Sequence, residues 1–115
     1  MIDLASIPLS PARRAGDLLF LAGQVALDGG AITSPDIEGQ TRQVMANIQA
    51  VLSDHGLDLS NVVNATVWLA DDEDFGAFNR TYAEYFLDAP PARTTVISKL
   101  LLGAKIEIAV VAHFG

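Results

Sequence analysis

The chain has 115 residues, a length that suits one domain with its own hydrophobic core. Hydrophobic residues make up 50% of it and charged residues only 18%, so we expect part of the apolar surface to meet another subunit. Fourteen acidic residues against seven basic ones give a net charge of -7, which disfavours nucleic acid as a partner. The sequence contains no cysteine, which excludes disulfides and thiolate chemistry.

The sequence indicates neither a secretory signal nor a membrane span. Its start, Met1-Ile2-Asp3-Leu4, lacks a basic segment followed by an apolar run. No apolar stretch approaches the length needed to cross a bilayer. We therefore expect a cytoplasmic protein without a membrane partner.

Short apolar segments near the N-terminus predict strands. The run from Leu18 to Ala22 is short and flanked by glycine, which favours a buried strand, and Arg13-Arg14-Ala15 is a candidate partner for it. Asp28-Gly29-Gly30 follows another apolar segment. It predicts a hairpin turn, because glycine tolerates the positive φ that tight turns require.

The clearest predicted element is a long helix that opens at Ser34-Pro35-Asp36. Ser34 is the expected cap and Pro35 the expected first helical residue. The residues that recur at helical spacing are Ile37, Thr41, Val44, Ile48, Val51 and Leu52. Gly56 is expected to close the helix in a left-handed conformation.

The second half of the chain alternates predicted strands with one more helix. Strands are expected at Val62 to Leu69, Arg93 to Ile97 and Lys105 to His113. Asp71-Asp72 is the expected cap of a helix that Pro90-Pro91 ends. Its aromatic stripe consists of Phe75, Phe78, Tyr82 and Phe86. A helix between strands implies a mixed sheet, so the predicted fold class is α+β.

The last predicted strand is apolar on both of its faces. Ile106, Ile108, Val110 and Ala112 point one way, and Ala109 and Val111 point the other way beside Glu107. In the strand from Val62 to Leu69, alternation assigns Val63, Ala65, Val67 and Leu69 to one face and Val62 and Trp68 to the other. Two helices cover only one face of such a sheet, so we expect another subunit to cover the second.

Two charged residues in apolar strands are candidates for chemistry. Arg93 is a permanent planar cation that suits a carboxylate, and the alternative is an edge arginine with its head in water. Glu107 is a candidate general base or water-holding group. Its alternatives are a structural salt bridge to Arg93 or Lys105, or a solvated edge position.

Other polar residues allow weaker inferences. Gly23 follows an apolar strand and either admits a ligand close to the backbone or simply ends the strand. Asn79 either orients a substrate or bonds to a neighbouring loop. His55 and His113 have no ligand partner at metal spacing, so we expect both to be structural and no metal to be bound.

Several segments together match the pattern of one family across nearly the whole chain. They are Arg14-Ala15-Gly16-Asp17-Leu18-Leu19-Phe20-Leu21-Ala22-Gly23-Gln24, Gln40-Thr41-Arg42-Gln43, Asn47-Ile48, Asp74-Phe75, Asn79-Arg80-Thr81-Tyr82-Ala83-Glu84-Tyr85-Phe86, Pro91-Ala92-Arg93 and Lys105-Ile106-Glu107-Ile108. The ordered set resembles the RidA (YjgF) family of enamine/imine deaminases.

The resemblance implies a fold, an assembly and an activity. Residues 1-115 would form a single RidA-like domain with a chorismate-mutase-like α+β fold, in which two helices pack on one face of a mixed sheet. Three copies would form a homotrimer with clefts between subunits. Members hydrolyse reactive enamines and imines such as 2-aminoacrylate without a cofactor, which implies a 2-iminobutanoate/2-iminopropanoate deaminase-like hydrolase acting on a small imino or carboxylic acid.

The resemblance also implies roles for single residues. Arg93 would grip the substrate carboxylate and Glu107 would position the attacking water. Gly23 would contribute its backbone, and Asn79 and Thr95 would lie at substrate-binding positions. We expect Arg93 and Glu107 to face one cleft, at a seam where Arg93 meets groups of a neighbouring chain.

The chain departs from the family pattern at three positions. Leu9 replaces a tyrosine, Ala22 a serine and Thr95 a frequent cysteine. These changes leave open whether activity on 2-aminoacrylate is reduced or redirected. The alternatives to a deaminase are a non-catalytic trimer that binds small acids or acts as a holdase, and an endoribonuclease, which the net charge of -7 disfavours.

Overall fold

The computed structural model describes residues 6–115, and no helix in that part is long and apolar enough to cross a membrane. Its strands are β1 (Ala12–Ala15), β2 (Leu18–Leu21), β3 (Gln24–Val25), β4 (Leu27–Asp28), β5 (Ala31–Ile32), β6 (Val62–Leu69), β7 (Ala92–Ile97) and β8 (Ile106–His113). Its α-helices are α1 (Ile37–Asp54) and α2 (Phe75–Ala83), and its 3₁₀ turns are η2 (Leu59–Asn61), η3 (Asp72–Asp74) and η4 (Leu101–Gly103).

The larger sheet is mixed and has β8 near its centre. Its strand order is β1-β2-β8-β6-β7, and β3 also pairs with β8. The pair β6–β7 is parallel and the other pairs are antiparallel, so the sheet is mixed, as the sequence predicts. Strands β4 and β5 form a separate hairpin at the predicted turn, where Gly29 and Gly30 have φ values of 63° and 86°.

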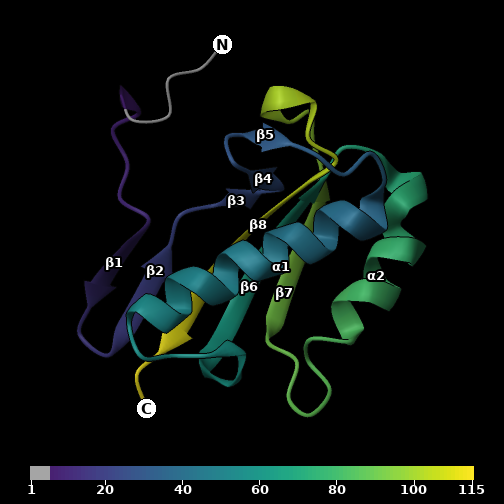
Figure 1. Ribbon diagram of the computed structural model, residues 1–115. Helices are drawn as coiled ribbons and strands as arrows, with labels where there is room; N and C mark the ends of the chain where they lie inside the picture. The colour runs from purple at the N-terminus through teal and green to yellow at the C-terminus, as the bar shows by residue number, and fades with distance from the viewer. Residues whose placement is uncertain (1–5) are drawn as a thin grey trace.

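Both helices cover the same face of this sheet. Figure 1 shows α1 crossing in front of the strands with α2 beside it. The buried residues of β8 alternate along the strand and are Ile106, Ile108, Val110 and Ala112. They form one core with side chains of α1 and α2, among them Ile48 and Phe78. The prediction of an α+β fold with two helices on one face of a mixed sheet is confirmed.

No helix formed by residues 6–115 lies over the other face of the sheet. Glu107, Ala109 and Val111 of β8 lie on this face and are half-buried. Phe20 and Val96 flank them from β2 and β7 and are exposed. The predicted apolar second face is therefore present in the single chain.

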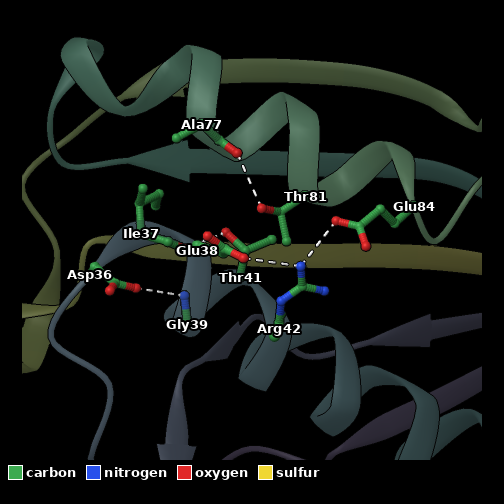
Figure 2. Close-up of polar contacts among 9 residues, drawn as sticks. All are labelled: Asp36, Ile37, Glu38, Gly39, Thr41, Arg42, Ala77, Thr81 and Glu84. Carbon is green, nitrogen blue, oxygen red and sulfur yellow. Dashed lines mark hydrogen bonds and ion pairs between the residues drawn. The ribbon is translucent and has the colours of Figure 1, made fainter.

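Helix α1 begins and ends with recognisable caps. The prediction that Ser34 caps it is wrong, because the Asp36 side chain accepts a hydrogen bond from the backbone N–H of Gly39 at 2.7 Å (Figure 2). Pro35 accordingly lies before the helix. At the other end Gly56 has a φ of 72°, and the N–H of Leu57 bonds to the carbonyl of Leu52, which confirms the predicted left-handed cap.

A surface ion pair connects the two helices. The Arg42 guanidinium of α1 donates to Glu38 of the same helix at 3.1 Å and to Glu84, the residue after the end of α2, at 3.0 Å (Figure 2). All three side chains are largely exposed, so solvent screens the pair and its contribution to stability is small. Packing between α1 and α2 therefore depends mainly on their buried apolar side chains.

A bulge in β6 changes which valine faces the core. Simple alternation predicts Val63 beside Ala65 in the core and Val62 on the opposite face. The register of β6 against β8 shifts between Val62 and Asn64. As a result Val62 is 5% exposed and Val63 is 47% exposed, so this prediction is wrong.

Helix α2 is shorter than predicted. Asp71 caps the preceding turn η3, where its side chain accepts from the Glu73 N–H, and the helix ends at Ala83, well before Pro90. Phe86 lies beyond the helix but still packs on Tyr82, with ring centroids 4.9 Å apart. The aromatic stripe is thus partly built by the turn after α2.

Phe78 is fully buried between α2 and the sheet, and we predict that Phe78→Ala strongly destabilises the fold. Removing a buried aromatic ring leaves a cavity, which costs about 3–5 kcal/mol of unfolding free energy. Urea unfolding at one fixed protein concentration measures the loss. Gln49→Ala, on the exposed side of α1, serves as the control and should change the value by less than about 0.5 kcal/mol.

Candidate functional site

A cavity of about 350 Å³ lies against the uncovered face of the sheet, beside β8. Its walls come from the segment before β1, the chain between β2 and β4, and the turn η4. Glu107 is the one charged residue among the described residues that line it. The volume lies within the range of small-molecule sites, and a carboxylate in mostly apolar walls is the usual composition of such a site.

At this cavity the Gly23 backbone lies so close to the Glu107 side chain that no side chain at position 23 would fit between them. A Cβ built on Gly23 would overlap a carboxylate oxygen of Glu107 and would lie 3.1 Å from its Cδ. Only glycine therefore leaves the carboxylate its present place beside the backbone. The structure brings these two predicted site residues together.

The Glu107 side chain has no polar partner within residues 6–115. No ion pair or hydrogen bond of the described residues involves it, so the alternative of a salt bridge to Arg93 or Lys105 is not observed. The Cα register partner of Glu107 on the neighbouring strand β6 is Trp68. A half-buried carboxylate without a partner is free to accept a hydrogen bond from a ligand or a water molecule.

Two side-chain amides of helix α1, those of Gln40 and Asn47, bond to chain segments beside the cavity. The Gln40 amide donates to the Ser34 carbonyl and accepts from the Lys105 N–H, both at 2.9 Å, which anchors the chain immediately before β8. The Asn47 amide donates to the carbonyls of Val25 and Leu27 at 3.2 and 3.0 Å. The Asn47 amide thus holds two residues of the cavity wall, and the Gln40 amide positions, through Lys105, the strand that carries Glu107.

Arg93 lies on the opposite face of the sheet from Glu107. It is the Cα register partner of buried Ala65, whereas Glu107 pairs with Trp68 on the other face. The strand that carries it, β7, is an edge strand of the sheet. Within one chain the two residues do not share a cleft. The expectation that they face one cleft therefore applies only to a cleft between copies.

Aromatic rings surround the Arg93 guanidinium. Its Cζ lies 5.1 Å from the ring centroids of Phe78 and Tyr82 and 5.9 Å from that of Phe75. Cation–π attraction of this kind orients the guanidinium without consuming its hydrogen-bond donors. No ion pair in the described part of the chain involves Arg93, so its fork remains available for a carboxylate.

Tyr82 places a polar atom in this aromatic cluster. Its hydroxyl is buried and has no hydrogen-bond partner within the described residues. Burial raises the pKa of the Tyr82 phenol, and the nearby Arg93 cation partly opposes that rise. The hydroxyl is therefore held neutral, close to a permanent positive charge.

The remaining predicted site residues lie on the same side of the sheet as Arg93. Thr95 follows it by two positions on β7 and so shares its face of the strand. Asn79 of α2 is four positions after Phe75, which places it on the same side of that helix as Phe75. One chain therefore carries two separate groups, which we call the glutamate group (Gly23 and Glu107) and the arginine group (Arg93, Thr95 and Asn79).

Sequence reasoning identified some cavity residues and missed others. Leu9 and Ala22, the first two departures from the family pattern, both line the cavity, as does Gln24. Leu101 and Leu102 of η4 line it too, and the sequence shows no periodicity there that would have predicted it. No cluster that could hold a metal occurs among residues 6–115, and His55 bonds to the Val51 carbonyl.

We predict that Gly23→Ala displaces the Glu107 carboxylate while leaving the fold intact. The atom that the new Cβ meets is the far end of a flexible side chain, so the change in unfolding free energy should stay within about 1 kcal/mol. A crystal structure of the variant would show the rotated side chain. Gly76→Ala is the matched control, since its Cβ would meet only Arg80 Nη1 at 3.6 Å. An unmoved Glu107 would contradict the prediction.

We also predict that the Tyr82→Phe variant loses less stability than the parent protein as the pH rises through the alkaline range. The pKa of Tyr82 is higher in the folded chain than when unfolded. Stability from the neutral phenol is complete below the unfolded pKa, ~10, and is lost as pH rises through the higher folded value. Urea unfolding of both proteins between pH 9 and pH 11, about one unit either side of the unfolded pKa, would measure how stability falls with pH in each. Parallel curves for the two proteins would refute it.

Comparison with known proteins identifies one family. The family described as Endoribonuclease L-PSP matches residues 3–114. A RutC family protein of Pyrococcus horikoshii is 45% identical over 109 residues, which cover 92% of this chain and 86% of that protein. The chloroplastic Reactive Intermediate Deaminase A of Arabidopsis thaliana is 43% identical over 108 residues, covering 91% of this chain and 58% of that protein.

A solved structure agrees with the sequence matches. The YjgF gene product of E. coli has a TM-score of 0.87 at 29% identity, covering 92% of this chain and 87% of that one. It shares the two helices and the mixed sheet described above. The chain therefore belongs to the RidA (YjgF) family.

Proposed function

We propose that this protein hydrolyses reactive enamines and imines of the 2-aminoacrylate type, in a site that two copies of the chain complete. The observation that carries the proposal is the unpartnered Glu107 carboxylate, packed against Gly23 in a cavity of about 350 Å³. A carboxylate so placed is suited to hold a water molecule beside a bound substrate. The name of the Arabidopsis relative, Reactive Intermediate Deaminase A, supports the same chemistry.

The reaction needs orientation and proton transfer rather than a strong electrophile. An enamine first takes a proton from solvent on carbon and gives up a proton from nitrogen, which makes it the imine. Glu107 then accepts a proton from water while the water oxygen bonds to the imine carbon. The proton returns to the nitrogen to give a carbinolamine, whose hydroxyl proton then passes through Glu107 to the same nitrogen as the carbon–nitrogen bond breaks, and a 2-oxo acid and ammonia leave. Atoms and charges balance, and a positioned base of this kind contributes roughly 10²–10⁴-fold.

Arg93 is the proposed carboxylate clamp. Its planar fork makes paired charge-assisted bonds with a carboxylate, and the rings of Phe78 and Tyr82 limit the directions it can take. Holding the carboxylate fixes the distance between the imine carbon and the water at Glu107. Asn79 and Thr95, on the same side of the fold, are the proposed further contacts.

The two groups of residues require a second copy. Glu107 lies on the uncovered face and Arg93 on the helix-covered face of an edge strand, so one chain alone cannot bring both to one substrate. A neighbouring copy that covers the apolar face would supply the missing group. A closed ring, with three copies as the family resemblance implies, gives each copy one such neighbour on either side.

RNA cleavage, which the family description names, has less support in this chain. The net charge of -7 repels a phosphate backbone. The cavity walls are apolar and contain no cation among their described residues. A non-catalytic acid-binding trimer remains the alternative, and it differs from the deaminase in binding carboxylates without turnover.

We predict that two inactive variants restore activity to each other when mixed. Arg93→Ala and Glu107→Gln should each lower turnover of an enamine generated in solution by roughly 10²-fold or more. Refolded together in equal amounts, they should recover about a quarter of the parent activity. In a closed ring each site takes its glutamate from one copy and its arginine from the next, and about a quarter of the sites then have both intact. Stopped-flow decay of the enamine absorbance is the measurement.

The same mixing experiment has a matched negative control. The double variant Arg93→Ala/Glu107→Gln, refolded with Arg93→Ala, supplies no intact arginine and should recover nothing. Arg13→Ala, which removes an exposed arginine outside both groups, should keep the parent rate. An inactive mixture would overturn the composite site. A parent protein that binds carboxylates without accelerating hydrolysis would overturn the deaminase.

A further inference from the structure

We propose that the cavity beside Glu107 is a subsite for an aliphatic substituent, so that the protein prefers 2-imino acids with branched, leucine-sized side chains over 2-iminopropanoate. This inference rests on the proposed function, because it assumes that the reacting carbon lies at Glu107. The residues that would set the preference are Leu9, Ala22, Leu101 and Leu102.

The position of the subsite follows from the geometry of Glu107. Its carboxylate lies against Gly23 at the wall of the cavity. A water held by Glu107 attacks the imine carbon at close range, so that carbon must also lie at the cavity. With the substrate carboxylate turned toward Arg93 of a neighbouring copy, the substituent on the same carbon extends into the remaining space.

The chemistry of the walls selects the kind of substituent. Apart from Gln24 and Glu107, every side chain among the described residues lining the cavity is apolar. Leu9 contributes to it although 62% of its surface is exposed in the single chain. A hydroxylated or charged substituent would find few partners in these walls and would lose its own hydration. An alkyl group has no hydrogen bonds to water to lose, and its burial removes apolar surface from water.

The volume selects the size. The cavity of about 350 Å³ corresponds to the liquid volume of on the order of ten water molecules. The attacking water and a single methyl group would leave most of that space to water against apolar walls. A four-carbon branched group would displace much of this water, which is favourable where the water has few polar partners.

The turn η4 provides a second observation. Leu102 has a φ of 63°, a left-handed conformation that bulky residues rarely adopt, and Gly103 after it has a φ of 67°. Such strain persists where the surroundings require it. Leu101 and Leu102 are both exposed leucines in this turn, and both line the cavity. The strained turn therefore supplies an apolar wall where the substituent would lie.

The test compares parent and variants on two imines generated in solution by an amino-acid oxidase, one from alanine and one from leucine. The parent should favour the leucine-derived imine in kcat/KM by at least roughly tenfold, since each methylene in an apolar pocket changes discrimination by roughly 10–200-fold. Leu102→Gly should reduce that ratio roughly tenfold. Glycine adopts the observed φ without strain, so the turn should keep its shape. Ala22→Ser, which adds a hydroxyl with little volume, should act in the same direction.

A binding measurement separates this inference from the proposed function. Calorimetry with 4-methylpentanoate and propanoate, neither of which can be hydrolysed, should show at least roughly tenfold tighter binding of the larger acid, lost in Leu102→Gly. Leu87→Gly, at a leucine that is 83% exposed and outside the cavity, is the control and should leave both ratios unchanged.

Each outcome has one meaning. Equal kcat/KM for the two imines in an active parent would overturn the aliphatic subsite and leave the deaminase standing. Selective binding of the larger acid without any turnover would overturn the deaminase and support the subsite. Equal binding together with no turnover would overturn both.

Discussion

The burial of one face of β8 is the constraint on which the rest of the structure depends. Ile106, Ile108 and Val110 lie under α1 and α2, and strict alternation then sends Glu107 to the opposite face. In the described part of the chain both helices lie on the other side of the sheet from that face, as Figure 1 shows. A carboxylate on a covered face would need a buried partner, whereas here it lines a cavity beside Gly23. The position of the candidate site is thus a consequence of how the core forms.

The same alternation separates the two charged residues most suited to chemistry. Arg93 shares a face with Ala65 and lies against aromatic rings, while Glu107 shares a face with Trp68. Covering the apolar face and completing the site are then one requirement, which a second copy would meet. Folding and activity are coupled in such an arrangement, because the contact that removes apolar surface from water also supplies the missing functional group.

Local patterns in the sequence predicted most of the secondary structure. The strand from Val62 to Leu69, the Gly56 cap and the hairpin at Gly29 follow from periodicity and from the conformational freedom of glycine. The errors lie where two local signals compete. Ser34 and Asp36 both suit a helix cap, and in the structure the Asp36 side chain makes the cap hydrogen bond. The bulge before Asn64 adds a residue to one strand and reverses the assignment of Val62, which alternation cannot anticipate.

The sequence by itself determined that one sheet face would remain apolar and uncovered, because it provides two helices and strands that are apolar on both sides. It also singled out Arg93 and Glu107 as charges in apolar strands. Only the tertiary structure decided that they lie on opposite faces, that Gly23 contacts Glu107, and that η4 adds Leu101 and Leu102 to the cavity. The reason is physical: strand register and the approach of distant segments depend on the packing of the whole chain, which no local pattern encodes.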